Sequence, residues 1–471
     1  MEATTTVSSS FHVIVLIPIS ILFIYHLLRR CYSTAKPTGN YCPFADPLLG
    51  NLIPYLRNQR RFLDWAADLL SRSPTGTIEL RGPLGIFRGV ATVRPLVVDH
   101  LLRSNFSNYV KGDRTRAALS DLLGHGIFSA DGHLWSLQRK TASREFTTRS
   151  LKSFVSDVVR FQLRDRLLPR LSVASDEGGT VDLQDLLRRF AFDNICTIAF
   201  GTDPASLRPG SGRFLNVGSE RKLRNVMKTI DEYAMNIIEL KEQQGTKKLD
   251  LLSRKFLRDI VISFILAGKD TTSAGLTWFF WLLAVHPRSE QRIYEEITKH
   301  DEEAAQVMGY EELKGMKYLH AAITEALRVY PPVPIDSRVA VADDVLPDGT
   351  CVKAGWFADY CPYAMARDEG LWGTDCRDFK PERWLDEKGE FVGMDAARFP
   401  VFNAGPRTCM GKEMAYVQMK AVAAAVIRRF RVEVAALEHS GGGEVSVPEH
   451  EMSITLRMKG GLPVRLKRRM K

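Results

Sequence analysis

A cysteine that follows a turn rich in glycine and proline, and that leads directly into a helical pattern, is the residue best placed to do chemistry. It is Cys409, within the run FNAGPRTCMG over residues 402–411. A sulfur near the start of a helix lies close to backbone N–H groups, which stabilise its thiolate form. Glycine at Gly405 and Gly411 favours a tight bend and a close approach to a flat ligand. Arg407 supplies a cation that can pair with an anionic group. The pattern predicts a thiolate metal ligand, and the alternative is a buried free cysteine, which is common in proteins.

The ten-residue frame from Phe402 to Gly411 resembles the haem-binding signature of the cytochrome P450 family. This resemblance implies a haem b cofactor with Cys409 as the axial iron ligand and Arg407 as a partner of a haem propionate. Thiolate ligation donates electron density to iron and favours O–O cleavage. The helical periodicity along the chain predicts a mostly α fold with a minor β portion, as expected for a cytochrome P450.

Two further motifs occur before the cysteine in the order found in the family. Residues 325–328, EALR, resemble the ExxR motif, and Glu325 and Arg328 share one helix face at this spacing. Residues 379–384, FKPERW, resemble the element that adds Arg383 to the pair. The resemblance implies a buried charge network that supports the loop on the haem side.

The run AGKDTT over residues 267–272, inside an apolar helical pattern over 253–285, resembles the oxygen-activation motif of the family. The resemblance implies that Gly268 leaves room beside the iron, that Asp270 relays protons from solvent, and that Thr271 offers a hydroxyl to bound oxygen. The alternative is that the threonine hydroxyl bonds back to the preceding turn of its own helix.

Trp135 and Arg139, spaced i, i+4, resemble the contact that an early helix of the family makes with a haem propionate. The alternative is a cation–aromatic pair on a surface helix. Arg338 is a further candidate propionate partner, and the candidate substrate contacts are Ile127, Phe128, Val333 and Ile335.

The composition argues against several other classes of function. The net charge is 65 − 55 = +10, but the basic residues are spread along the chain and no zinc-finger spacing occurs, so nucleic-acid binding is not expected. The seven cysteines include no CxxC pair, which argues against a disulfide framework or a structural zinc site and favours a reducing compartment.

The N-terminal sequence predicts a membrane anchor. After a short tail at 1–10, residues 11–30 contain the apolar run VIVLIPISILFIYHLL and end in two arginines. Because positive charge follows the apolar run, the bulk of the chain is expected in the cytosol, with the anchor in the endoplasmic reticulum membrane. The alternative is a cleaved signal peptide. A hinge rich in proline and glycine at 31–54 precedes one catalytic domain at 55–471.

Two stretches carry further structural predictions. Residues 453–465 read as a strand. Between residues 201 and 252 one long helical pattern, 219–243, appears where the family usually has two helices over the substrate pocket. The chain is therefore expected to be shortened at 201–252.

The resemblance implies a monooxygenase that receives electrons from NADPH through a flavoprotein reductase. Four stretches, at 126–135, 267–283, 330–350 and 357–367, resemble the plant fatty-acid ω-hydroxylase branch. A fatty acid hydroxylated at or near its ω end is the expected substrate, and a jasmonoyl–amino-acid conjugate, an oxylipin, is the alternative. Two other readings are an isomerase or dehydratase of peroxides, which Asp270 and Thr271 disfavour, and a catalytically impaired haem-binding membrane protein.

Overall fold

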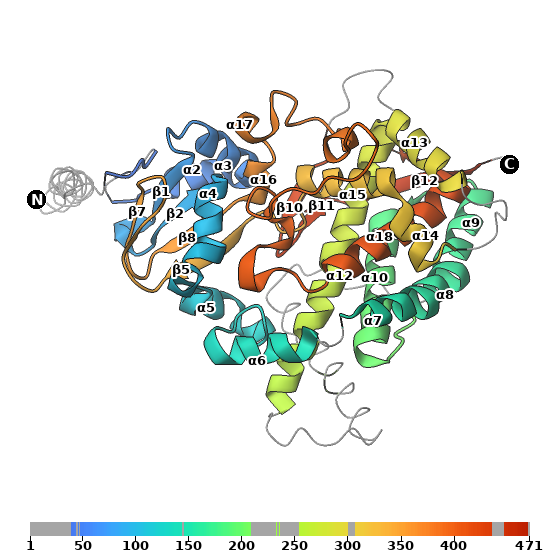
Figure 1. Cartoon of the computed structure of the whole chain (residues 1–471), viewed down its shortest axis with the longest axis horizontal. Helices are drawn as coiled ribbons and strands as arrows, with labels where there is room; N and C mark the ends of the chain where they lie inside the picture. The colour runs from blue at the N-terminus through green and yellow to red at the C-terminus, as the bar shows by residue number, and fades with distance from the viewer. Residues whose placement is uncertain are drawn as a thin grey trace, which may run out of the picture. The chain divides into compact units, whose positions relative to one another are not determined.

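The computed structural model describes residues 39–43, 46, 48–143, 146–208, 232, 235, 254–299, 307–435 and 447–469. These residues form two compact units, a small one within Met1–Val110 and Asp336–Asp368, and a large one within Lys111–Ile335 and Glu369–Lys471 (Figure 1). The sequence predicted one domain over 55–471. No single linker separates the units, because a late segment of the chain, Asp336–Asp368, belongs to the small unit. The single catalytic domain stays a prediction.

The small unit is built on a five-stranded sheet of order β1-β2-β8-β5-β3, in which β2 and β8 are parallel and the other neighbours antiparallel. A two-stranded sheet joins β6 to β7. The strands are β1 (Thr77–Arg81), β2 (Arg88–Thr92), β3 (Tyr109–Val110), β5 (Asp336–Ala340), β6 (Asp344–Val345), β7 (Cys351–Val352) and β8 (Phe357–Tyr360). The helices are α2 (Leu52–Asn58), α3 (Phe62–Ser71), α4 (Pro95–Asp99) and α16 (Pro362–Met365).

The large unit is mostly helical, in agreement with the predicted fold class. Its helices are α5 (Gly112–Leu123), α6 (Gly132–Ala142), α7 (Thr148–Ser153), α8 (Arg160–Gln162), α9 (Leu168–Asp176), α10 (Leu183–Phe200), α12 (Arg254–Val285), α13 (Pro287–Thr298), α14 (Tyr310–Gly315), α15 (Lys317–Val329), α17 (Glu369–Trp372) and α18 (Lys412–Arg429). Two π-helical segments, η6 (Phe154–Val159) and η7 (Leu163–Leu167), join α7, α8 and α9 into one helical run.

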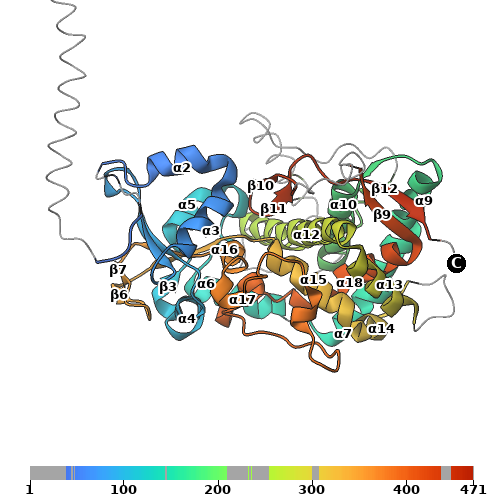
Figure 2. The ribbon, with the colours of Figure 1, turned by 90° about the horizontal axis from the view of Figure 1, so that it is seen from above.

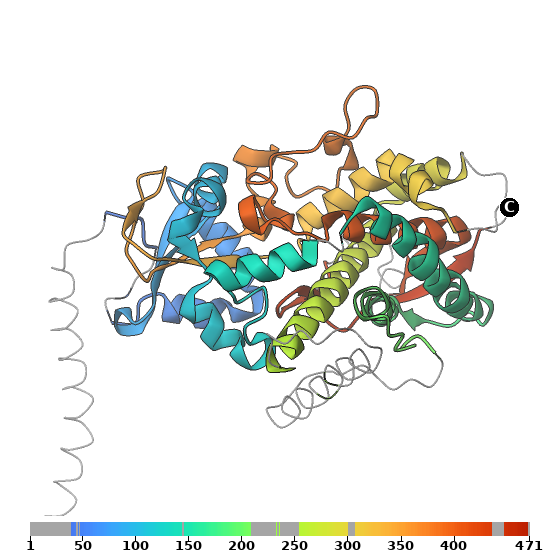
Figure 3. The ribbon, with the colours of Figure 1, turned by 60° about the horizontal axis from the view of Figure 1, so that its bottom comes forward.

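Helix α12 runs through the middle of the large unit and is contacted by α10, α15 and α18 (Figures 1 and 3). Its second half carries Trp278, Phe279 and Phe280, each at most 1% exposed. The Trp278 Nε1–H donates to the carbonyl oxygen of Leu456 at 3.0 Å, and its ring stacks on Tyr330 with centroids 4.0 Å apart. These contacts fix α12 against the end of α15 and against β11.

The strands of the large unit correct one prediction. β4 (Val181–Asp182), β12 (Pro463–Arg468) and β9 (Phe430–Val434) form one sheet, shown beside α9 in Figure 2, and β10 (His450–Met452) pairs with β11 (Leu456–Met458). The single strand predicted at 453–465 is therefore wrong. Gly460 and Gly461 have φ values of 80° and 86° and turn the chain between β11 and β12.

Two predicted features lie outside the described residues. They are the anchor at 11–30 and the helical pattern at 219–243, apart from Glu232 and Met235. Within the described part of the chain, no helix has the length and the apolar composition needed to cross a membrane.

Helix α15, which carries the ExxR motif, is held at its first turn by a side chain from another helix. The Glu296 carboxylate of α13 accepts hydrogen bonds from the backbone N–H groups of Lys317, Tyr318 and Leu319, each at 2.8 Å. These N–H groups have no partner within their own helix, and a negative charge at a helix N-terminus is favourable. Glu296 therefore fixes the start of the helix that positions Glu325 and Arg328.

We expect Glu296→Ala to lower the free energy of unfolding of the haem-loaded protein by about 1–2 kcal/mol, because three N–H groups lose their acceptor. Urea denaturation, followed by loss of haem absorbance, measures the change. The matched control is Glu295→Ala on the same helix, where the carboxylate is exposed and accepts a hydrogen bond from Gln291 at 3.0 Å. Equal effects of the two substitutions would contradict the capping role.

Candidate functional site

The loop that carries Cys409 has a defined backbone. It contains two short turns of 3₁₀ helix, η9 (Pro400–Phe402) and η10 (Gly405–Arg407), and ends where α18 begins. The Cys409 N–H donates to the carbonyl oxygen of Phe402 at 2.8 Å. Gly405 has a φ of 62°, a conformation that favours glycine. Gly411 has a φ of −86°, so its backbone does not require glycine, but an added Cβ would lie 4.0 Å from the Cys409 sulfur.

The Cys409 side chain reaches solvent, although protein atoms surround much of its sulfur. This burial raises the pKa of the Cys409 thiol, while the Gly411 N–H and the charges of Arg139 and Lys412 act in the opposite direction. Burial in turn lowers the pKa of the Arg139 guanidinium, and a negative charge on Cys409 would raise it. The two groups therefore stabilise each other's charged forms.

Two predicted cations and the predicted tryptophan meet beside this loop. The Arg139 Nη2 donates to the carbonyl oxygen of Thr408 at 2.6 Å. The Arg407 Nη2 donates to Asp131 Oδ1 at 2.7 Å and lies with its guanidinium 4.6 Å from the centre of the Trp135 ring. Arg139 lies 5.9 Å from the same ring. The cation–aromatic pair on α6 is thus present, and it also contacts the cysteine loop. The propionate role of Trp135 and Arg139 stays a prediction.

The Glu325 carboxylate is completely buried and accepts five hydrogen bonds. Arg328 donates from Nε at 2.7 Å and from Nη2 at 2.8 Å, and Arg383 donates from Nε at 3.2 Å. Trp384 Nε1 donates at 2.9 Å and the Lys380 backbone N–H at 3.0 Å. The structure therefore brings together the three residues predicted as a network and adds Trp384 to them.

The two arginines of this network also hold the chain between α17 and η8 (Pro381–Trp384). Arg328 donates to the carbonyl oxygens of Cys376 at 2.7 Å and Asp378 at 3.0 Å. Arg383 donates to the carbonyl oxygen of Trp372 at 2.9 Å and forms an ion pair with Asp375 at 2.7 Å. The irregular segment is thereby fixed to α15.

Asp270 and Thr271 lie in the middle of α12. The Asp270 carboxylate lies 3.4 Å from Lys269 Nζ and 3.9 Å from Arg188 Nε on α10. Burial lowers the pKa of both cations, and Asp270 opposes this effect. The Thr271 hydroxyl donates to the carbonyl oxygen of Ala267 at 2.6 Å, the back-bonded arrangement considered as the alternative.

Gly268 faces α10 in this structure. A Cβ added there would lie 2.5 Å from Ile195 Cγ1, so the glycine permits close packing of α10 on α12. The role of Gly268 in leaving room for dioxygen stays a prediction, as does the proton-relay role of Asp270 and Thr271.

The remaining predicted residues are the candidate propionate partner Arg338 and the four candidate substrate contacts. Arg338 belongs to the small unit, is fully buried, and pairs with Asp336 Oδ2 at 2.8 Å. In the large unit, Ile127, Val333 and Ile335 are half-buried and Phe128 is exposed. The propionate role of Arg338 and the four substrate contacts stay predictions.

Sequence reasoning missed two residues of the cysteine loop and its surroundings. Asp131, which pairs with Arg407, lies 276 positions away in the sequence, and no local pattern indicates the pair. Asn403 has a φ of 63°, and its Oδ1 accepts the N–H of Ala404 at 2.8 Å. A positive φ is uncommon outside glycine, and such conformations gather at functional sites.

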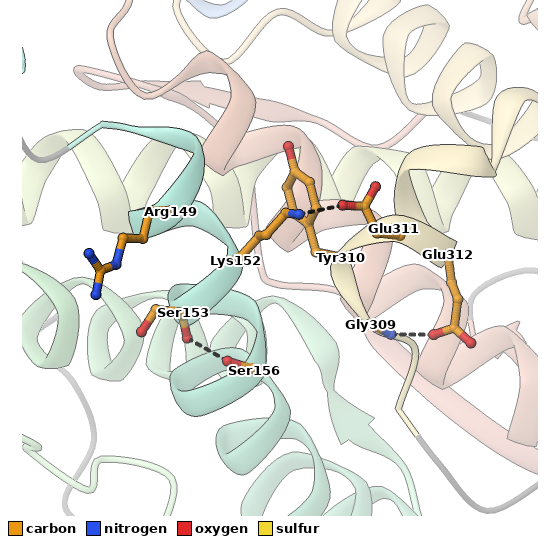
Figure 4. A pocket seen from close by; sticks show the side chains of 8 residues that line it. All are labelled: Arg149, Lys152, Ser153, Ser156, Gly309, Tyr310, Glu311 and Glu312. Carbon is orange, nitrogen blue, oxygen red and sulfur yellow. Dashed lines mark hydrogen bonds and ion pairs between the residues drawn. The ribbon is translucent and has the colours of Figure 1, made fainter.

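A separate pocket of about 540 Å³ opens on α7, η6 and α14 (Figure 4). It is lined by Arg149, Lys152, Ser153, Ser156, Gly309, Tyr310, Glu311 and Glu312. Lys152 and Glu311 form an ion pair at 2.7 Å, and both side chains are more than half exposed. The pocket contains none of the predicted site residues, and we do not assign it to the site.

Comparison with known proteins places this arrangement in a family. The family model described as "Cytochrome P450" matches in two pieces, residues 90–220 and 214–441. A relative named Cytochrome P450 94A2, from Vicia sativa, is 45% identical over 93% of each chain. Cytochrome P450 94B3, from Arabidopsis thaliana, is 42% identical over 95% of this chain and 96% of its own. Cytochrome P450 CYP94D108, from Paris polyphylla, is 42% identical over 93% of each chain.

The thiol loop, the buried Glu325 network and the cations beside Cys409 have the donor types that a haem-thiolate site needs. The chain belongs to the cytochrome P450 family, whose members are oxidoreductases of the monooxygenase type. The described residues fit the haem that this family implies. Cys409 supplies one sulfur donor that reaches solvent, and Trp135, Arg139 and Arg407 supply donors beside it that suit anionic propionates.

We expect Glu325→Gln to lower the free energy of unfolding by roughly 3–5 kcal/mol, because the buried Arg328 guanidinium loses its ion pair with this carboxylate and Arg383 loses one of its two carboxylate partners. Less haem should be retained after expression, and urea unfolding should shift to lower concentration. Glu311→Gln, which removes an exposed carboxylate from an ion pair, is the matched control and should change neither quantity. Wild-type haem content and stability in Glu325→Gln would contradict the structural role of the network.

Proposed function

We propose that this protein hydroxylates an aliphatic substrate that carries a carboxylate, namely a fatty acid at or near its ω end. The observation that carries the proposal is the resemblance of four stretches, including 126–135 and 267–283, to the plant fatty-acid ω-hydroxylase branch. The first of these stretches contains two apolar residues, Ile127 and Phe128. They shortly precede Ala130, whose carbonyl oxygen accepts a hydrogen bond from Arg407. Apolar side chains at this place suit an aliphatic chain, since burial of each CH₂ contributes roughly 0.8 kcal/mol.

The residues of this chain have separable roles in the proposal. Haem, when bound, supplies the iron at which dioxygen is activated. Cys409 would hold it through sulfur, and Trp135, Arg139 and Arg407 would hold its propionates. Asp270 would take protons from solvent and pass them to the Thr271 hydroxyl, which in this structure donates to the carbonyl oxygen of Ala267.

The proposal includes a partner and a location. Electrons from NADPH would arrive through a flavoprotein reductase, and the exposed Lys140 and Lys412 beside the Cys409 loop suit an acidic partner surface. Residues 11–30 would anchor the chain in the endoplasmic reticulum membrane with the catalytic domain in the cytosol. The arginines after the apolar run support this orientation.

The same experiment tests two other candidate functions. A jasmonoyl–amino-acid conjugate also combines a carboxylate with an aliphatic tail, and one subgroup of the resembled branch acts on such conjugates. The observation behind a catalytically impaired haem-binding protein is the two-piece family match, whose pieces overlap at 214–220, inside the stretch predicted to be shortened.

Full-length protein in membranes with a plant reductase and NADPH should hydroxylate dodecanoic acid, and the product should carry oxygen at or near the methyl end. Turnover of a jasmonoyl–isoleucine conjugate in preference to the fatty acid would instead support the oxylipin candidate. Haem binding without oxidation of either compound would support the impaired protein and contradict the proposal.

In the same assay, Thr271→Ala should uncouple NADPH consumption from product formation, with a larger share of electrons recovered as hydrogen peroxide. Thr277→Ala is the control, because Thr277 makes the same kind of back-bond on the same helix, to Ser273 at 2.7 Å. If both variants keep wild-type coupling, Thr271 has no role in proton delivery.

A further inference from the structure

The segment between α5 and α6 is fastened at both ends to parts of the candidate site. It covers residues 124–131 and runs beside the first half of α12 (Figure 3). Its first residues are held by Asp259 of α12, eleven positions before Asp270 on the same helix. Its last residues are held by Arg407 of the cysteine loop.

The first attachment is a buried carboxylate. Asp259 is fully buried, and its Oδ2 accepts the backbone N–H of His125 at 2.8 Å. Its Oδ1 accepts Arg258 Nη1 at 2.8 Å, and the same guanidinium donates to the carbonyl oxygens of Leu122 at 3.2 Å and Asp121 at 3.0 Å. A buried carboxylate is favourable only when it is paired and hydrogen-bonded, as this one is. Removing it takes away the acceptor of the His125 N–H and the carboxylate partner of the Arg258 guanidinium.

The backbone of the segment lies directly on α12. Gly124 has a φ of 47°, and a Cβ there would lie 2.1 Å from Asp259 Oδ2. A Cβ at Gly126 would lie 2.1 Å from the hydroxyl oxygen of Ser263, one turn further along α12. No side chain larger than hydrogen fits at either position without displacing the segment or the side chain of Asp259 or Ser263. The close approach allows the His125 N–H to reach the carboxylate.

The second attachment joins the segment to the cysteine loop. The Arg407 Nη2 donates to the carbonyl oxygen of Ala130 at 2.9 Å and to Asp131 Oδ1 at 2.7 Å. Asp131 also accepts the backbone N–H groups of Lys111 at 2.9 Å and Gly112 at 3.0 Å, at the start of α5. The side chains of Ser129 and Gln138 brace the middle, donating to the carbonyl oxygens of Gly124 at 2.7 Å and His125 at 2.9 Å.

Ile127 and Phe128 therefore lie between an attachment to the helix that carries Asp270 and an attachment to the loop that carries Cys409. Phe128 is 39% exposed, although the next residue, Ser129, is buried and hydrogen-bonded to Gly124 and Gly126. An exposed aromatic ring on a fastened segment is placed where a ligand with apolar surface can contact it. Its position depends on the two attachments.

We infer that Asp259 is a positioning residue, which fixes Ile127 and Phe128 and thereby determines which carbon of an aliphatic substrate is hydroxylated. The inference deepens the proposed function and rests on it for the nature of the substrate. The Asp259 carboxylate binds the His125 N–H and the Arg258 guanidinium, and neither group takes part in the proposed reaction. It acts through the backbone of residues 124–126.

Haem-loaded full-length Asp259→Ala tests the inference. Hydrogen exchange of the peptide that contains His125 should become about tenfold faster, because a buried hydrogen bond is lost, while peptides from α15 and α18 keep their protection. Affinity for dodecanoic acid, measured by the spin shift, should fall about fivefold, and hydroxylation should spread from the end of the chain to inner carbons. Asp259→Asn keeps the shape of the side chain and one acceptor oxygen. It should therefore change the exchange rate and the affinity in the same direction, by a smaller factor.

The matched control is Asp113→Ala on α5, whose carboxylate is 97% exposed and pairs with Arg116. It should leave exchange, affinity and product distribution unchanged. The binding affinities of phenylimidazole and imidazole give a second test that does not depend on the fatty acid. The phenyl group of phenylimidazole needs apolar side chains to pack against, whereas imidazole is too small to reach them. Asp259→Ala should weaken binding of phenylimidazole and leave that of imidazole unchanged.

Faster exchange at His125 with wild-type product distribution and wild-type phenylimidazole affinity would make Asp259 merely structural and overturn the inference. Unchanged exchange would also overturn it. If the wild type neither binds nor oxidises dodecanoic acid, the proposed function fails, and the comparison of phenylimidazole with imidazole still decides the role of Asp259.

Discussion

The buried carboxylate of Glu325 sets the arrangement of much of the large unit. A carboxylate with no exposure is unstable unless donors surround it, and here two guanidinium groups, one indole N–H and one backbone N–H do so. Two of these donors, Arg383 and Trp384, come from η8, more than fifty residues beyond α15. The requirement to satisfy one charge therefore fixes the long irregular segment that precedes the Cys409 loop. Glu296 fixes the other end of α15, so the carboxylate has a rigid support.

The candidate site is held from two directions. On one side, the Cys409 loop is fixed by its own backbone, by Arg139 through Thr408, and by Arg407 through Asp131. On the other side, α12 is packed against α10 at Gly268 and against Tyr330 at Trp278. The segment at 124–131 connects the two, because Asp259 and Arg407 hold its opposite ends. Residues that the family would use for haem, for protons and for substrate are thus placed by one continuous set of contacts.

The sequence predicted the parts of this arrangement that depend on local spacing. The pairing of Glu325 with Arg328 follows from i, i+3 on one helix, and the position of Cys409 before α18 follows from the turn and the helical pattern. Contacts over long separations were not predictable: no local pattern joins Asp131 to Arg407, Asp259 to His125, or Gly268 to Ile195. The prediction of one strand at 453–465 was wrong because the alternation of hydrophobic residues continues through the turn at Gly460 and Gly461. The two-unit division was hidden because residues 336–368 return to the first unit.

The assignment of Cys409 as the axial ligand is tested most directly by the spectrum of the reduced, carbon monoxide-bound protein. The wild type should show the absorption band that thiolate-ligated haem gives in this state, and Cys409→Ser should lose it. Cys376→Ser, which changes a buried cysteine of the segment held by Arg328, should keep it. Retention of the thiolate band in Cys409→Ser would show that another residue ligates the iron and would contradict the account.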